Sequence, residues 1–543
     1  MKDSKFFALP FISAMLMGLL SCNTNSTSNT QRPLTLDFSL DEKISLSWLV
    51  GTQQSESLSN SPLVSAIEKK FNVKFTITEK STADYQSYKN NKIASGNFPD
   101  IVSNLTSAEV KGYGSARFVE LSQYLDYLPN YKEKVNIAIN EDFNNYGYLF
   151  DMDGKMYGVN HYSYNPTPIW DFSYNKTKFD AAMKKANVSS LTTWDNIEKC
   201  LKVIKEENTN AYPIEFTKIN NVGIKKPLQL FVESFTGGKA TTMNHLAFDE
   251  AQGKFVLSLD VAGYKEAILY FNKLYSLGYV DPDYLNNDLE TTINRLATTA
   301  AFGAGYVGGY VGNTNIYRNS LGDYEPLDIP ISTGQNKTYG RMVTAFDEVS
   351  TGINIKKVGN DAKKLGRVLL ILDYLYSDEF LELQWYNDDV TNKPTVGDRS
   401  TYTFKDIIFD RNSEINYRDI YYPWSFLANF QDLNNEILED SNPYIEYKEK
   451  HLVKNAKQYY SSIPNVWFSS KNQDTISKAI ARIEDIFGAR LAAFVSGGYP
   501  FSDDDWNAFV SDVKSSGGTT IVKLYNDAYS AYVSKKNEVE GSK

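Results

Sequence analysis

Flat aromatic side chains and polar groups that suit hydroxyl recognition are the chemistry-bearing residues that this sequence offers in greatest number. It contains 38 Tyr, 30 Phe and 7 Trp. Tyr and Trp combine an apolar face with a polar edge, which matches the apolar C–H faces and hydroxyl rims of sugars. Because aromatic residues also fill cores and can follow genome composition, the excess favours carbohydrate binding without requiring it.

Three candidate ligand-binding residues lie at the ends of predicted strands near the N-terminus. Trp48 ends the first of these strands, where it either stacks on a ligand or packs in the core. Asp100 follows a Phe-Pro turn, and its carboxylate either accepts hydrogen bonds from two ligand hydroxyls or caps the next element. Asn104, just past the strand at 100–102, carries both a donor and an acceptor and suits hydroxyl recognition.

The residue inventory does not indicate a metal, a cofactor or a nucleic acid. The three histidines, His161, His245 and His451, form no His-x-x-x-His pair, and the two cysteines are too few for a structural zinc site. Cys200 lies in a helical pattern and is expected to be a buried thiol. With 56 basic and 66 acidic side chains and no basic cluster, the net charge of −10 disfavours nucleic-acid binding.

A calcium loop is also rejected. Asp151 and Asp153 have the spacing of the first ligands of such a loop. The sixth and twelfth positions, which need Gly and Glu, are Met156 and Tyr162. We instead predict a tight hairpin-like turn at residues 153–155, Asp-Gly-Lys.

Residues 1–21 have the organisation of a secretory signal peptide. Lys2 and Lys5 precede the apolar run 6–20, which is shorter than the roughly 18 to 20 residues of a membrane span. Residues 19–22, Leu-Leu-Ser-Cys, resemble the bacterial lipobox, in which Cys22 becomes the lipidated first residue of the mature chain. Residues 22–42 begin as a tract of Asn, Ser, Thr and Gln, typical of a flexible tether. We predict an exported, lipid-anchored envelope protein on the outer face of the cytoplasmic membrane or in the periplasm; the alternative is a plain secretory signal with an incidental cysteine.

The elements that position the candidate residues alternate between strand and helix. Hydrophobic periodicity predicts strands at 43–49, 73–77 and 100–102, with helices at 63–71 and 85–93 between them. This β-α-β-α-β order argues for a mostly parallel sheet flanked by helices. Further helices are predicted from Thr192 or Thr193 to Glu207 and at 264–277, 360–376, 475–487, 503–515 and 521–533. A chain of 543 residues is longer than a single hydrophobic core usually supports. We therefore expect two or more lobes.

Five short motifs occur in the order that is typical of one family. They are 94–102 (Ala-Ser-Gly-Asn-Phe-Pro-Asp-Ile-Val), 153–159 (Asp-Gly-Lys-Met-Tyr-Gly-Val), 170–176 (Trp-Asp-Phe-Ser-Tyr-Asn-Lys), 193–195 (Thr-Trp-Asp) and 274–282 (Leu-Tyr-Ser-Leu-Gly-Tyr-Val-Asp-Pro). In this the chain resembles the extracellular solute-binding proteins of bacterial ABC importers, specifically the large carbohydrate-binding lipoprotein group (family 1-like). The resemblance covers roughly residues 43–376, with a further helical match at 506–532.

The resemblance implies an α/β fold with two lobes, the type II periplasmic-binding-protein-like fold, whose hinge the chain crosses several times. Lobe 1 is expected at 43–160 and 345–395, and lobe 2 at 161–344 and 396–535. The ligand is expected in the cleft between the lobes, which closes on it. Open parallel sheets bind ligands at the carboxyl ends of their strands, which agrees with that location.

The family layout adds further candidate ligand-binding residues. Trp170 lies beside the expected hinge, Asp347 follows the return to lobe 1, and Trp385 lies near the last crossing. Tyr306 and Tyr310 belong to a glycine-rich segment where relatives often have Gly-Lys-x-Ala-Met, so this segment departs from the family pattern. They are the preferred stacking platform, although the glycines can also serve tight packing alone.

Trp424, in the aromatic segment 421–424, completes the set of candidates. Trp194, Trp467 and Trp506 are assigned to packing, because each belongs to a helix start or an apolar run.

The expected function is that of a monomeric, non-catalytic receptor without a cofactor. It would capture a carbohydrate, in the first instance an oligosaccharide, and deliver it to the permease subunits of an ABC transporter, touching the membrane through its N-terminal lipid alone. Three alternatives remain open: the same fold binding a peptide or other solute, a helical surface glycan-binding lipoprotein, and a glycoside hydrolase with two paired carboxylates.

Overall fold

The computed structural model describes most of the chain in twelve stretches. They are residues 34–52, 57–164, 171–216, 224–240, 245–305, 321, 323–327, 330, 346–380, 430–432, 463–497 and 501–541. Cys22, Trp170, Tyr306, Tyr310, Trp385 and Trp424 lie outside these stretches. Asp347 lies in a described strand, but its side chain is not described.

A six-stranded sheet forms the first lobe, in the order β12-β4-β11-β3-β1-β2. Its strands are β1 (Ile44–Thr52), β2 (Val73–Ser81), β3 (Ile101–Thr106), β4 (Val159–Tyr164), β11 (Phe346–Ile353) and β12 (Phe430–Asp432). All run parallel except β11, which is antiparallel to both of its neighbours. The predicted β-α-β-α-β start is confirmed, with α1 and α2 as the connecting helices.

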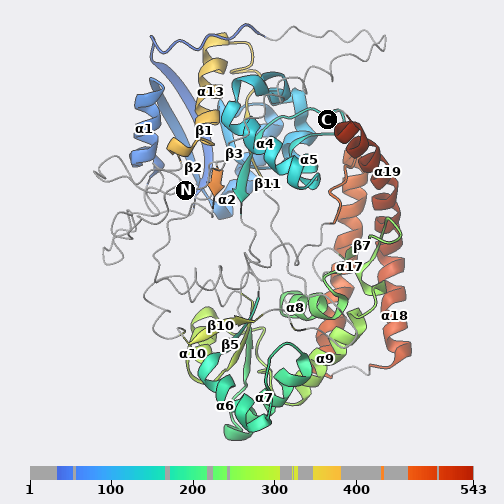
Figure 1. Cartoon of the computed structure of the whole chain (residues 1–543). Helices are drawn as coiled ribbons and strands as arrows, with labels where there is room; N and C mark the ends of the chain where they lie inside the picture. Colours follow the sequence, from blue (N-terminus) through green and yellow to red (C-terminus); the bar gives the residue numbers. More distant parts are fainter. Residues whose placement is uncertain are drawn as a thin grey trace, which may run out of the picture.

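The helices of the first lobe pack around this sheet (Figure 1). They are α1 (Pro62–Lys70), α2 (Thr82–Ser95), α3 (Ser107–Tyr113), α4 (Pro129–Glu141), α5 (Asn144–Leu149) and α13 (Ala362–Tyr374). The turn predicted at residues 153–155 forms, because Asp151 accepts backbone hydrogen bonds at its Oδ1 from Asp153 (2.9 Å) and Lys155 (2.8 Å). The run before it is the helix α5 rather than a strand, so this turn does not join a hairpin.

A four-stranded sheet, in the order β10-β5-β9-β6, lies in the second lobe. Its strands are β5 (Asp171–Asn175), β6 (Ile214–Phe216), β9 (Phe302–Gly305) and β10 (Tyr324–Leu327), and a separate hairpin is formed by β7 (Leu246–Asp249) and β8 (Lys254–Leu257). The helices are α6 (Lys176–Ala186), α7 (Trp194–Glu207), α8 (Lys225–Thr236), α9 (Tyr264–Ser276) and α10 (Leu289–Thr298). Thr193 caps α7 by accepting a hydrogen bond from Asn196 N, as predicted.

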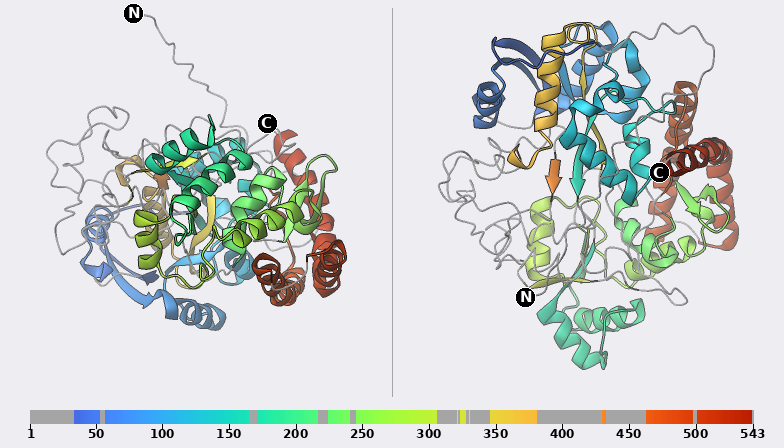
Figure 2. Two further views of the ribbon diagram at one scale, coloured as in Figure 1. Left: turned by 90° about the horizontal axis from the view of Figure 1, so that it is seen from below. Right: turned by 45° about the horizontal axis from the view of Figure 1, so that its top comes forward.

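Three helices form the C-terminal part of the described chain, and the last of them connects the two cores. They are α17 (Ser470–Ser496), α18 (Asp503–Val513) and α19 (Thr519–Gly541), with a π-helical turn at Lys514–Gly518 between the last two. Ile521 of α19 is buried in the core of the second lobe and Tyr532 in that of the first. In Figures 1 and 2 these helices run along one side of the molecule from one lobe to the other.

Among the described residues, the first lobe extends past its predicted bounds, since β4 continues to Tyr164 although lobe 1 was predicted to end its first segment at residue 160. β12 pairs with β4 in the first sheet, although residues 396–535 were predicted to belong to lobe 2. Val466, which precedes α17, and Tyr532, which lies in α19, also pack in the first core. Sequence-local patterns do not report such long-range pairing.

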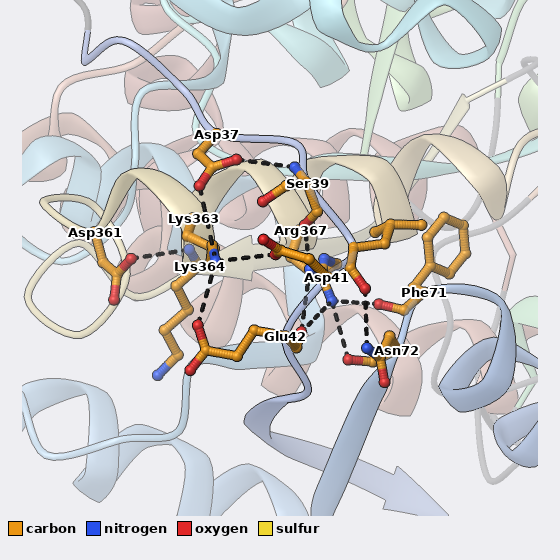
Figure 3. Close-up of polar contacts among 11 residues, drawn as sticks. Asp37, Ser39, Asp41, Glu42, Phe71, Asn72, Asp361, Lys363, Lys364 and Arg367 are labelled. Carbon is orange, nitrogen blue, oxygen red and sulfur yellow. Dashed lines mark hydrogen bonds and ion pairs between the residues drawn. The ribbon is translucent and has the colours of Figure 1, made fainter.

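The N-terminal strap, residues 34–43, is fastened across α13 at the amino end of β1 (Figure 3). The buried Arg367 donates to the backbone oxygens of Ser39 and Asn72, the latter at 3.0 Å. Lys363 pairs with Asp41 at 3.1 Å and with Glu42 at 3.2 Å. Residues 34–42, which the sequence placed in the flexible tether, are therefore held against the first lobe.

In the stretches that the structure describes, no helix has the length and apolar composition needed to cross a membrane.

Candidate functional site

Two sheet edges face each other across the junction between the lobes. β4 ends at Tyr164 and β5 begins at Asp171, so the carboxyl edge of the first sheet is the edge from which the chain leaves for the second lobe. Since β1, β2 and β3 are parallel to β4 in that sheet, their carboxyl ends lie at the same edge.

The second sheet presents the equivalent edge to the first lobe. Asp171, the first residue of β5, pairs with Gly305, the last residue of β9. β6 runs parallel to β9, so its carboxyl end, Phe216, lies at this edge too. Ligands of open α/β sheets bind outside the carboxyl ends of strands, so the two facing edges form the candidate site. Tyr306 and Tyr310 follow β9 in the chain, but both lie outside the described residues.

Asn104 is the predicted residue that the structure places at the edge of the first sheet. It lies inside β3, which continues to Thr106 rather than ending at Val102 as predicted. Its backbone φ is +52°, a left-handed conformation that is uncommon for residues other than glycine. Its Oδ1 accepts a hydrogen bond of 3.2 Å from Gly51 N at the end of β1. The side chain is half-buried at the edge that faces the second lobe.

Trp48 occupies the core rather than this edge. Its side chain is 3% exposed, and its ring packs against Phe75 at a centroid distance of 5.4 Å. Its indole nitrogen donates to Ser103 Oγ at 2.8 Å. β1 continues to Thr52, so Trp48 lies in the middle of the strand and not at its end. This placement favours packing over ligand stacking, the two roles that the sequence left open.

Asp100 lies at the opposite, amino end of β3. It is 4% exposed, and its carboxylate accepts hydrogen bonds from the backbone and hydroxyl of Ser47, each at 2.7 Å. Lys364 Nζ lies 2.7 Å from the other carboxylate oxygen. All of these partners belong to the first lobe, and they join β3 to β1 and α13. The placement favours a structural role.

Asp347 is the second residue of β11, beside β3 and β4, where only its backbone is described. The remaining candidates, Trp170, Tyr306, Tyr310, Trp385 and Trp424, fall outside the described residues, so their roles stay predictions. The three tryptophans predicted to serve packing do so: Trp194 and Trp506 are buried in the second core, and Trp467 packs against the first. Cys200 is buried as predicted, and burial raises the pKa of its thiol to about 11.

A buried ion pair that was not predicted from the sequence lies beside Asn104. Lys89, on α2, is fully buried and lies 2.7 Å from a carboxylate oxygen of Glu109 on α3. Lys89 also donates to the backbone oxygen of Asn104 at 2.9 Å. A signal for it exists in the sequence, because Lys89 interrupts an apolar stripe with Tyr85 and Ile93 at a spacing of four residues.

A second buried charge cluster was also missed, in the second lobe. Glu215 on β6 is 1% exposed, with Arg295 at 3.6 Å and the Asn287 amide at 3.5 Å. Burial raises the pKa of Glu215 to about 7, although Arg295 acts in the opposite direction. Asp281, from the predicted Asp-Pro motif, pairs with the same Arg295.

Within the described stretches, no group of three or more His, Cys, Asp or Glu side chains is arranged to hold a metal ion.

The comparisons with known proteins agree with this architecture. The chain is 23% identical over 510 residues to the polygalacturonan/rhamnogalacturonan-binding protein YtcQ of Bacillus subtilis (strain 168), covering 90% of this chain and 92% of that protein. Among solved structures it is similar to an HMO binding ABC-transporter associated solute binding protein from Bifidobacterium longum infantis, with a TM-score of 0.71, 18% identity, and coverage of 91% of this chain and 99% of that one.

A further structural neighbour is the ABC-transporter substrate binding protein FusA of S. pneumoniae in complex with kestose. Its TM-score is 0.65 at 14% identity, covering 90% of this chain and all of that one. These two-lobed neighbours confirm the predicted α/β, type II two-lobed fold. The family model for bacterial extracellular solute-binding proteins matches residues 63–349, more than half of the chain, and the protein therefore belongs to that family.

Proposed function

We propose that this protein is the substrate-capturing component of a bacterial ABC importer and that its ligand is an oligosaccharide held between the two lobes. The observation that carries the proposal is the agreement among its relatives. The matched proteins are named for a polygalacturonan or rhamnogalacturonan, for HMO, and for a complex with kestose. Each of these matches extends over at least 90% of this chain, so the likeness includes both lobes and not one shared domain.

The geometry of the facing edges supports the same ligand class. Asn104 on the first lobe offers an amide to a hydroxyl group, and Tyr306 and Tyr310, which follow β9 in the sequence, are the aromatic partners that we propose from the second lobe. Amide hydrogen bonds on one side and aromatic faces on the other are complementary to a sugar ring. Closure of the lobes would bring both onto one ligand, so that the closed state is favoured by contacts made only there.

The protein acts as a receptor and not as a hydrolase. Its family and its structural neighbours are binding proteins. We place it in the cell envelope as a monomer, tethered through a lipid on Cys22, so that its ligand passes directly to permease subunits. The six-stranded, mostly parallel sheet does not fit the helical surface glycan-binding lipoprotein that the sequence left as an alternative.

A thermal-shift screen tests the proposed ligand class. Purified protein is heated with a panel of mono- and oligosaccharides, and with amino acids and short peptides for comparison. A ligand that binds the native state raises the midpoint by mass action. We expect a rise with one class of oligosaccharide, which is then recovered uncleaved. A rise with peptides alone would overturn the sugar assignment, and recovery of cleaved glycan would overturn the assignment as a receptor.

A further inference from the structure

The backbone at Asn104 is held in an unusual conformation. Besides the positive φ, the pairing of β3 with β11 changes register here: Leu105 lies opposite Ser350 and Val102 lies opposite Gly352. Two residues of β3 therefore face one residue of β11, which is a β-bulge. Bulges redirect side chains and are common beside binding sites, and strained backbone persists only where its surroundings enforce it.

Lys89, on α2, contacts the bulge from outside the sheet. Its ammonium donates to the Asn104 carbonyl oxygen at 2.9 Å, while Gly51 N donates to Asn104 Oδ1 at 3.2 Å. Both acceptor oxygens of Asn104 are thus occupied. Its Nδ2 finds no acceptor among the described residues, and the half-buried side chain lies at the edge that faces the second lobe. This donor is available to a ligand.

A buried ammonium is costly, and this one has a carboxylate to offset the cost. Glu109 lies 2.7 Å from Lys89 Nζ, accepts from Gln86 at 3.0 Å, and accepts from Thr106 N at 2.7 Å as part of a capping box at the start of α3. Tyr85 adds a hydrogen bond to the backbone oxygen of Ser103, the residue before Asn104. The contacts from α2 and α3 thus converge on the bulge.

Gly51 allows this convergence. A Cβ at this position would lie 2.8 Å from the Tyr85 ring, so the close approach of α2 to the end of β1 requires glycine here.

We propose that Lys89 is a positioning residue for sugar recognition: through the Asn104 carbonyl it holds the bulge so that Asn104 Nδ2 donates to a hydroxyl of the bound oligosaccharide. This inference rests on the proposed function. It adds a residue that does not touch the ligand itself, and it assigns Asn104 the donor role.

A double-mutant cycle in oligosaccharide affinity tests the proposal. The four proteins are the wild type, Lys89→Met, Asn104→Gly and the double variant. Methionine keeps the length of the side chain without the donor, and glycine accepts the positive φ while removing the amide. We expect each single change to weaken binding about tenfold, which corresponds to about 1.4 kcal/mol. We expect Lys89→Met to have no further effect once Asn104 is glycine, because coupled residues are not additive.

A loss of folding stability alone would not make the effects of the two substitutions on affinity non-additive. Lys364→Met is the matched control, because Lys364 pairs with Asp100 at 2.7 Å at the opposite end of the same strand. It should lower the melting temperature and leave oligosaccharide affinity within about twofold of the wild type. If Lys89→Met does not fold, Lys89→Met with Glu109→Gln removes the two charges together and enters the cycle in its place.

The outcomes separate the inference from the function on which it rests. Wild-type binding with a non-additive cycle supports the positioning role. Wild-type binding with additive effects, or with affinity unchanged by Lys89→Met, overturns that role and leaves the proposed function intact. A wild type that binds none of the oligosaccharides overturns the proposed function, and the inference with it.

Discussion

The role that a polar side chain of the first sheet can have depends on which end of its strand it occupies. Asn104 and Asp100 are four positions apart, yet Asn104 lies at the edge that faces the second lobe and Asp100 at the far edge, bound by Ser47 and Lys364. Both were candidates from the sequence, because each has the chemistry to bind a hydroxyl. Residue type identified the possible chemistry, and strand direction decides which residue can use it.

The position of Trp48 within its strand could not be predicted from the sequence pattern. The alternating pattern suggested a strand that ended at residue 49, which would have placed Trp48 at an edge. The strand instead continues through Val50 and Gly51, both buried, to Thr52. Strands of parallel sheets that are covered on both faces are apolar throughout, so alternation is a poor guide to where they end.

The titration of Glu215 gives a prediction at this scale. Its pKa is raised to about 7 from an ordinary 4.5, so the native state retains a proton that the unfolded chain has already lost. The contribution of Glu215 to the free energy of unfolding should therefore be largest below pH 4.5, fall as the pH rises to 7, and stay constant above pH 7. The loss in the free energy of unfolding is on the order of 3 kcal/mol.

Unfolding midpoints of the wild type and Glu215→Gln between pH 4.5 and 8 measure this effect. The advantage of the variant over the wild type should grow across that window, because glutamine carries no charge to bury. Glu206→Gln, on an exposed side chain, controls for the loss of one carboxylate. Parallel pH profiles for the wild type and Glu215→Gln would show that Glu215 does not titrate as described.

At the scale of elements, local signals were sufficient to predict most helices and the first strands. The cap Thr193 lies where the pattern placed it, and α9 and α13 agree with the predicted ranges to within two residues. The pairing of β11 and β12 with β4 could not be predicted in the same way. These strands come from distant parts of the chain, and no short-range pattern encodes their partners.

The junction between the strap and α13 provides a test at this scale. Gly366 lies in α13 with the backbone of the strap directly above it, so that a Cβ would lie 2.5 Å from the Asp37 carbonyl oxygen. Gly366→Ala should destabilise the protein by about 1–3 kcal/mol, because the strap must move away. Chemical denaturation of the purified variant measures this change.

Gly488 in α17 is the matched helical control. Its Cβ would meet no atom within 4 Å, so Gly488→Ala should stabilise the protein by about 0.5–1 kcal/mol through helix propensity alone. The two substitutions should change the free energy of unfolding in opposite directions. Equal effects would mean that the strap does not dock on α13 in solution.

At the scale of the whole molecule, the strap and the last helix, α19, both attach to the first lobe. The strap attaches to α13, and Tyr532 of α19 donates a hydrogen bond of 2.7 Å to Asn144 of α5. A lipid on Cys22 would therefore tether the protein through its first lobe.

The proposed anchor gives a prediction for the whole protein in cells. Cys22→Ser removes the thiol that would carry the lipid, and stable anchoring needs two or more acyl chains. We expect the wild type in the membrane fraction and the variant in the soluble fraction after export, as measured by immunoblotting of fractionated cells. A processed variant that stays with the membrane would contradict the anchor.

The central claim is that both lobes hold one oligosaccharide between their facing sheet edges. Hydrogen–deuterium exchange of the protein with and without an oligosaccharide from the thermal-shift screen tests it directly. We predict slower exchange on binding in peptides from both β3, residues 101–106, and β9, residues 302–305. Protection confined to one lobe, or found away from both edges, would contradict capture between the lobes.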